Sequence, residues 1–118
     1  MGKKGNERPF TIMPTESNHC YLCGRFVSKY EGHWHHCIHG RANRGIADKE
    51  GLIVRLCKEC HTEGKGAVHR NPNMGNDLWL MKEAQDVWET KYIIDHDCER
   101  EEAREAFRQL FGKSYIYD

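Results

Sequence analysis

The chain has 118 residues, of which 38% are hydrophobic and 31% are charged, so it predicts a single domain with a small core. Lysine plus arginine and aspartate plus glutamate both number 18, and the resulting net charge of zero excludes no class of partner. The charge is unevenly placed, because residues 1–70 carry 12 basic and 7 acidic side chains while residues 71–118 carry 6 and 11. This asymmetry predicts a basic working face joined to an acidic C-terminal half.

The apolar runs of the chain are short, and Leu52-Ile53-Val54 is typical of them. Neither a transmembrane helix nor the core of a signal peptide is predicted. The first six residues, Met1 to Asn6, lack the Ser or Thr at position 6 that a myristoylation signal requires. We therefore expect a cytoplasmic protein with no membrane partner. In that reducing compartment, spaced cysteines bind metals or act in catalysis before they form disulfides.

The first 75 residues are predicted to consist of short segments joined by glycine-containing loops. In chain order these are a basic arm over 1–17, extended segments near Gly32–Ile38 and Leu52–Leu56 on either side of a loop from Gly40 to Gly45, a helix that begins near Lys58, and a loop over 62–75. Residues 18–75 are the expected core of the domain.

Two amphipathic helices are predicted to follow as a C-terminal extension of the same domain, over residues 76–118. The first is capped by Asn76 or Asp77 and runs to about Lys91, with its apolar face formed by Leu80, Met81, Ala84, Val87 and Trp88. The second runs from about Asp97 to Phe111 and is stopped by Gly112, with its apolar stripe formed by Ala103, Ala106, Phe107 and Leu110. Both apolar faces are expected to pack in the core.

Four of the six cysteines form two Cys-x-x-Cys pairs, Cys20/Cys23 and Cys57/Cys60, with 33 residues between the pairs. Four thiolates satisfy the tetrahedral preference of Zn²⁺, and the two-residue spacing lets a tight turn present both sulfurs of a pair to one ion. The pattern predicts a structural zinc site in which a knuckle, a hairpin and a helix form a treble clef. Cys37 and Cys98 lack paired spacing and are predicted to be ordinary buried thiols.

Other interpretations of the same residues are weaker. Four free or redox-active cysteines remain an alternative. The string from Cys57 to His61 matches the c-type haem attachment pattern, but that chemistry requires export and leaves Cys20 and Cys23 without a role. His61-Thr62-Glu63 resembles the His-x-Glu of zinc deaminases. Those enzymes need a cysteine pair downstream of this motif, whereas both pairs here lie upstream of it.

Six of the eight histidines lie between residues 33 and 69, and a zinc ion already held by four sulfurs does not need them. They are His33, His35, His36, His39, His61 and His69. Such clustering indicates a second metal, a proton-transfer group, or both. For His33 and His39 a role as exposed polar residues is equally compatible with the sequence, whereas the adjacent pair His35-His36 favours chemistry.

The string Trp34-His35-His36-Cys37-Ile38, followed by the Gly/Arg loop and by Leu56-Cys57-Lys58-Glu59-Cys60-His61, resembles the HNH endonucleases. These are the ββα-metal (His-Me finger) nucleases whose motif is braced by a four-cysteine zinc. The downstream Gly66-Ala67-Val68-His69 and the ending Phe111-Gly112-Lys113-Ser114-Tyr115 resemble small phage-encoded HNH proteins, some of them associated with recombination. The resemblance implies a small α+β fold with a ββα-metal core.

The resemblance also implies a role for each matched residue. His36 matches the general base, while His35 and His61 match ligands of a catalytic divalent cation, which could be Mn²⁺, Co²⁺, Ni²⁺, Zn²⁺ or Mg²⁺. His69 is a further candidate ligand because it returns after a short loop. The middle Asn of the motif has no counterpart in register, although Asn43 and Asp48 lie nearby.

The expected activity is metal-dependent hydrolysis of DNA phosphodiester bonds, as nicking or structure-directed cleavage, in the cytoplasm of a host if the chain is phage-encoded. Basic side chains expected to hold the DNA phosphates are Arg41, Arg44, Arg55 and Lys65. The alternative is a non-catalytic zinc module that binds nucleic acid or a protein, which would need the cysteines but not the histidines. The sequence leaves open whether the protein is a monomer or a homodimer.

Overall fold

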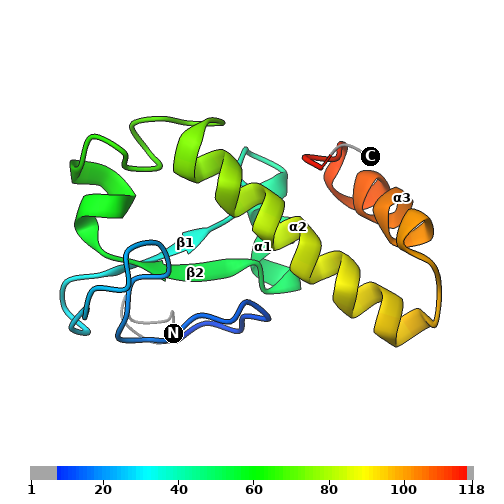
Figure 1. Cartoon of the computed structure of the whole chain (residues 1–118), viewed down its shortest axis with the longest axis horizontal. Coiled ribbons are helices and arrows are strands. Elements are labelled where there is room, and N and C mark those ends of the chain that lie inside the picture. Colours follow the sequence, from blue (N-terminus) through cyan, green and yellow to red (C-terminus); the bar gives the residue numbers. More distant parts are fainter. Residues whose placement is uncertain (1–7, 117–118) are drawn as a thin grey trace.

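The computed structural model describes residues 8–116, so residues 1–7 of the predicted basic arm lie outside the described range. Its elements in chain order are β1 (His33–His36), α1 (Asn43–Glu50), β2 (Ile53–Leu56), a π-helical turn η1 (Glu59–Glu63), α2 (Gly75–His96) and α3 (Arg100–Phe111). Helices and a two-stranded sheet confirm the α+β class. In Figure 1 the hairpin and η1 occupy one end of the molecule, and α2 runs diagonally from there to α3.

The two strands pair antiparallel, with His33 opposite Leu56 and His36 opposite Ile53. All four residues of β2 are buried, because Ile53, Val54 and Leu56 pack in the core and Arg55 is enclosed as well. On β1 the exposed His33 and half-buried Trp34 are followed by the buried His35, so the hairpin carries one histidine into the interior.

The connection between the strands contains a helix where the sequence predicted only the loop Gly40–Gly45. Helix α1 begins at Asn43 and ends at Glu50, and the following Gly51, with a positive φ of 75°, closes the last turn. Ala47 is its one buried residue, and an eight-residue helix with a single apolar anchor leaves no periodic signal in the sequence.

Both long helices have boundaries that differ from the predicted ones. Helix α2 begins after Met74 rather than at Asn76 or Asp77, and it continues past Lys91 to His96. Asp97, with a left-handed φ of 48°, ends α2, and α3 therefore begins at Arg100 rather than Asp97.

The predicted apolar face of α2 is largely confirmed, since Leu80, Met81, Ala84 and Trp88 are buried and Val87 is partly buried. On α3 the predicted stripe is only partly correct. Ala103 and Phe107 are buried, but Leu110 is 36% exposed and Phe111 takes its place in the core. The buried residues of α3 therefore follow a spacing of four, which continues from Phe107 to Phe111.

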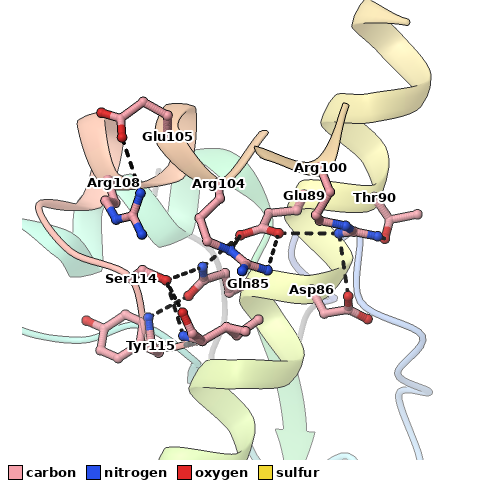
Figure 2. A network of polar contacts seen from close by, with 11 residues as sticks. Gln85, Asp86, Glu89, Thr90, Arg100, Arg104, Glu105, Arg108, Ser114 and Tyr115 are labelled. Carbon is pink, nitrogen blue, oxygen red and sulfur yellow. Dashed lines mark hydrogen bonds and ion pairs between the residues drawn. The ribbon is translucent and has the colours of Figure 1, made fainter. Parts of the chain in front are cut away.

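A buried polar network, which the sequence did not predict, joins α2 to α3 and to the C-terminal segment (Figure 2). Glu89 is fully buried, and its carboxylate accepts bonds from Nε and Nη2 of Arg104, both at 3.1 Å. Gln85 donates to Glu89 at 2.7 Å and to the Ser114 hydroxyl at 2.8 Å, and accepts from the Tyr115 backbone N–H at 2.7 Å. The network fixes α3 and the following segment on the middle of α2.

We expect Glu89→Ala to lower the free energy of unfolding by about 3–5 kcal/mol, because it leaves the Arg104 guanidinium largely buried without its carboxylate. Urea unfolding of the zinc-loaded protein, followed by circular dichroism, measures this change. The exposed pair of Glu105 with Arg108 on the same helix provides the control. Glu105→Ala should leave the urea midpoint unchanged, and an equal shift in both variants would contradict a special role for the buried network.

Candidate metal centres and the adjoining cleft

The four paired cysteines come together in space, as their spacing predicted. Cys20 and Cys23 lie on a turn closed by a backbone bond from the Gly24 N–H to the Cys20 carbonyl (2.9 Å), and Gly24 adopts a positive φ of 77°. Cys57 and Cys60 follow directly after β2. The four sulfurs all lie within 4.8 Å of one another and could hold a metal ion. We call this group the cysteine cluster. Of the other two thiols, Cys37 is buried as predicted and Cys98 is half-buried.

The geometry of the cysteine cluster fits zinc. The sulfurs of Cys23 and Cys57 are 3.8 Å apart. Two sulfurs bound to a tetrahedral Zn²⁺ at about 2.3 Å each are separated by about 3.8 Å, whereas a disulfide needs about 2.0 Å. Burial raises the pKa of Cys57 and Cys60. At Cys20 backbone N–H groups offset the effect of burial and lower the pKa to about 7. Crowded thiolates repel one another, so a cation is needed to hold all four deprotonated.

The three histidines implied as catalytic metal ligands also come together, and we call them the histidine cluster. His35 projects from β1 and is 4% exposed, His61 lies on η1, and His69 follows in the loop. Their candidate ligand atoms all lie within 4.8 Å of one another, and the Nε2 atoms of His61 and His69 are 2.9 Å apart. Backbone bonds from Val68 to Cys60 (2.9 Å) and from His69 to His61 (3.1 Å) fold the loop back onto η1.

The histidine cluster fits a divalent cation. No hydrogen bond within residues 8–116 engages the His35 ring, and Nδ1 of His61 is buried without a partner, so each ring has a nitrogen free for a cation. Burial, reinforced by the neighbouring histidines, lowers the pKa of His35 to about 3 and that of His61 to about 4. Both imidazoles are therefore neutral at pH 7, which is the form that binds metals. Protons compete with a cation for these two imidazoles only well below pH 6.5, the ordinary pKa of histidine.

A cleft with a volume of about 570 Å³ opens beside the histidine cluster, and its lining includes all three cluster histidines together with His36 and His39. His36 is partly exposed, and its Nε2 pairs with Oδ1 of Asp48 at 3.2 Å. Asp48 belongs to α1, the helix that the sequence did not predict. The cleft thus combines a candidate base and a candidate metal site, and the candidate base has an acidic partner on α1.

The four basic residues expected to contact DNA fall into different environments. Arg41 and Arg44 line the cleft, Arg44 from the first turn of α1. Lys65 is exposed in the loop after η1 and is not part of the cleft lining.

The prediction for Arg55 is wrong. Its side chain is 1% exposed, its Nη2 donates to the Ser28 carbonyl at 3.0 Å, and its guanidinium lies 5.2 Å from the centre of the Trp34 ring. The sequence shows a charged residue within the run Leu52–Leu56, and every position of that strand is enclosed in the fold. Arg55 therefore holds the loop of Ser28, which follows the turn of Cys20 and Cys23, against β1, and its side chain is not available to a ligand.

Asp77 belongs to this region as well, although its place in the sequence indicates only a helix cap. Its side chain is 1% exposed, and its Oδ2 lies 2.8 Å from Nε2 of His39 and accepts the Asn73 N–H at 2.7 Å. Its Oδ1 lies 4.0 Å from Nε2 of His35. An aspartate 42 positions after His35 in the chain carries no local pattern that could have joined it to the histidines.

Comparison of the chain with models of known families, with curated proteins and with solved structures yields no match. Among the helices of residues 8–116, none is long and apolar enough to cross a membrane.

Proposed function

We propose that this protein is a metal-dependent DNA endonuclease of the HNH type, which hydrolyses phosphodiester bonds in the cleft beside the histidine cluster. The observation that carries the proposal is that His36 opens into the same cleft as His35, His61 and His69. A candidate base and a candidate metal site in one cleft are what hydrolysis of a phosphodiester requires. A zinc module that only binds a partner has no need for this second cluster.

His36 acts in this proposal as the general base that takes a proton from the attacking water. The Asp48 carboxylate, 3.2 Å from Nε2, orients the imidazole and leaves Nδ1 for the proton transfer. Asp48 thereby supports the base from α1, in the connection between the two strands. The middle Asn of the HNH motif has no counterpart in register in this connection.

His35, His61 and His69 hold the catalytic cation, which when bound neutralises charge on the scissile phosphate and on the leaving oxygen. The burial of His35 and His61 keeps both rings neutral and fixes them on β1 and η1. Zinc in the cysteine cluster connects the knuckle to the end of β2 and to η1, in the arrangement of a treble clef. It thus holds His61, the residue immediately after Cys60, in place.

Arg41 and Arg44 bind phosphates of the DNA on the side of the cleft formed by the start of α1. Contacts of this kind give orientation and affinity without reading the base sequence. Lys65, exposed outside the cleft, extends the basic surface to flanking phosphates. The proposed substrate is accordingly DNA bound through its backbone.

The activity is tested with supercoiled plasmid and full-length protein that carries zinc in the cysteine cluster. Nicked product should form when a divalent cation is added and should be absent in EDTA. The double variant His61→Ala/His69→Ala should not nick at any cation concentration. Nicking that persists in this double variant would contradict a catalytic role for the histidine cluster.

The donor set also predicts which cation works. Three imidazole nitrogens suit Mn²⁺, Co²⁺ or Ni²⁺ better than Mg²⁺, which prefers oxygen ligands. We expect nicking at lower concentrations of Mn²⁺, Co²⁺ or Ni²⁺ than of Mg²⁺, measured as initial rates in parallel titrations. If Mg²⁺ gave the higher rate at every concentration, a carboxylate such as Glu63 would have to belong to the ligand set.

A further inference from the structure

The Asp77 carboxylate lies at the start of α2 and faces two histidines of different parts of the site. It is 1% exposed, and its Oδ2 is fully engaged by Nε2 of His39 at 2.8 Å and by the Asn73 N–H at 2.7 Å. His39 lines the cleft, whereas His35 belongs to the histidine cluster. Asp77 therefore connects the two.

The second carboxylate oxygen, Oδ1, is buried and has no hydrogen-bond partner. The nearest nitrogen of the histidine cluster, Nε2 of His35, is also buried without a partner and lies 4.0 Å away. A buried carboxylate oxygen and a buried ring nitrogen that remain unpaired each cost free energy. A movement of about 1 Å would bring them to hydrogen-bond distance.

Asp77 is not itself a member of the metal-binding group, since the residues whose ligand atoms lie mutually within 4.8 Å are His35, His61 and His69. Histidines that bind a metal through one ring nitrogen almost always donate the other N–H to a carboxylate, a carbonyl or water, which fixes the tautomer. The pair formed by Asp77 and His35 has the composition of such a contact.

We propose that Asp77 is the positioning residue of the histidine cluster: it accepts the Nε2–H of His35 and so presents Nδ1 of that ring to the cation. This inference rests on the proposed metal centre and adds the residue that orients one of its ligands, His35. Through His39, the same carboxylate fixes one wall of the cleft relative to the cation site.

The first test compares Co²⁺ binding by full-length parent and Asp77→Asn, each preloaded with one zinc per chain. The variant keeps the shape of the side chain and an oxygen that can accept the Asn73 N–H. We expect one Co²⁺ per chain in both proteins, the same visible absorption spectrum, and an affinity about 10–100-fold lower in the variant. Glu89→Gln, which neutralises a fully buried carboxylate on the same helix away from the cluster, should bind Co²⁺ as the parent does.

The outcomes separate the alternatives. Equal affinity in Asp77→Asn and the parent overturns the inference, as does an equal loss in Glu89→Gln, which would attribute the effect to a weakened α2. A changed Co²⁺ spectrum in Asp77→Asn also overturns it, because the carboxylate would then be a direct ligand. If the parent binds no Co²⁺ beyond its zinc, the proposed metal centre itself fails.

A second test needs no variant and so does not depend on the folding of Asp77→Asn. Long-range ¹H–¹⁵N NMR spectra of the ¹⁵N-labelled parent, loaded with zinc at both sites, report which nitrogen of each imidazole carries a proton. We expect the proton of His35 on Nε2. A His35 ring that is protonated on Nδ1 would overturn the inference.

Discussion

Replacing Cys57 with serine is expected to release zinc and to unfold most of residues 18–66. A structural zinc contributes about 10–16 kcal/mol of apparent binding free energy at neutral pH, which equals or exceeds the total stability of a typical small domain. Cys57 lies between β2 and η1, so loss of the zinc frees the turn of Cys20 and Cys23 from the end of β2 and from η1, the element that carries His61. Zinc content measured by mass spectrometry, together with a circular dichroism melt, checks this result. Cys20→Ser, Cys23→Ser and Cys60→Ser should behave alike.

Cys98→Ser is the matched control, because Cys98 is half-buried and lies outside the cysteine cluster. This variant should retain one zinc per chain at the cysteine cluster and melt close to the parent. Parent protein that contains no zinc when it is purified without chelator would contradict a structural zinc site. Release of zinc by the Cys98 variant would show that the loss is not specific to the cluster.

Replacing His36 with alanine is expected to lower the rate of DNA cleavage by about 10²–10⁴-fold while DNA affinity changes only a few-fold. A general base acts on the proton transferred in the transition state and contributes little to phosphate binding. Single-turnover rates on a short labelled duplex measure the first quantity, and fluorescence anisotropy at fixed salt measures the second.

His96→Ala is the control for this prediction, since His96 ends α2 and bonds to the Tyr92 carbonyl outside the cleft. Its rate and affinity should match those of the parent. Asp48→Asn should fall between the parent and His36→Ala, because it weakens the orientation of the base but keeps the imidazole. A large loss of DNA affinity in His36→Ala would instead make His36 a binding residue.

The parts of the site that could be predicted from the sequence are those with local spacing. Two Cys-x-x-Cys pairs can form tight turns wherever they occur, and the structure brings all four sulfurs together. The histidine cluster could be assembled because His35 lies on one strand of a hairpin and His61 directly follows the second cysteine pair. Even His69, which was predicted more from its proximity to His61 than from a motif, belongs to the group.

The parts that could not be predicted depend on contacts distant in the sequence. Helix α1 has one buried residue, so no periodic pattern in the sequence predicts it. The helix nevertheless supplies Asp48, the partner of His36. Arg55 appears in the sequence as one more basic residue, and only the packing of the loop of Ser28 against β2 encloses it. Asp77 approaches His35 and His39 because the loop after η1 returns α2 to the hairpin.

The most direct test of the proposed function is plasmid nicking by parent and His36→Ala proteins purified in parallel and assayed at the same Mn²⁺ concentration. Both proteins must first be shown to contain equal zinc and to have equal melting temperatures, so that a difference reflects the cleft alone. The proposal predicts nicked plasmid with the parent and almost none with the variant. Equal nicking by the two proteins, or none by either, would contradict it and favour a zinc module that binds without catalysis.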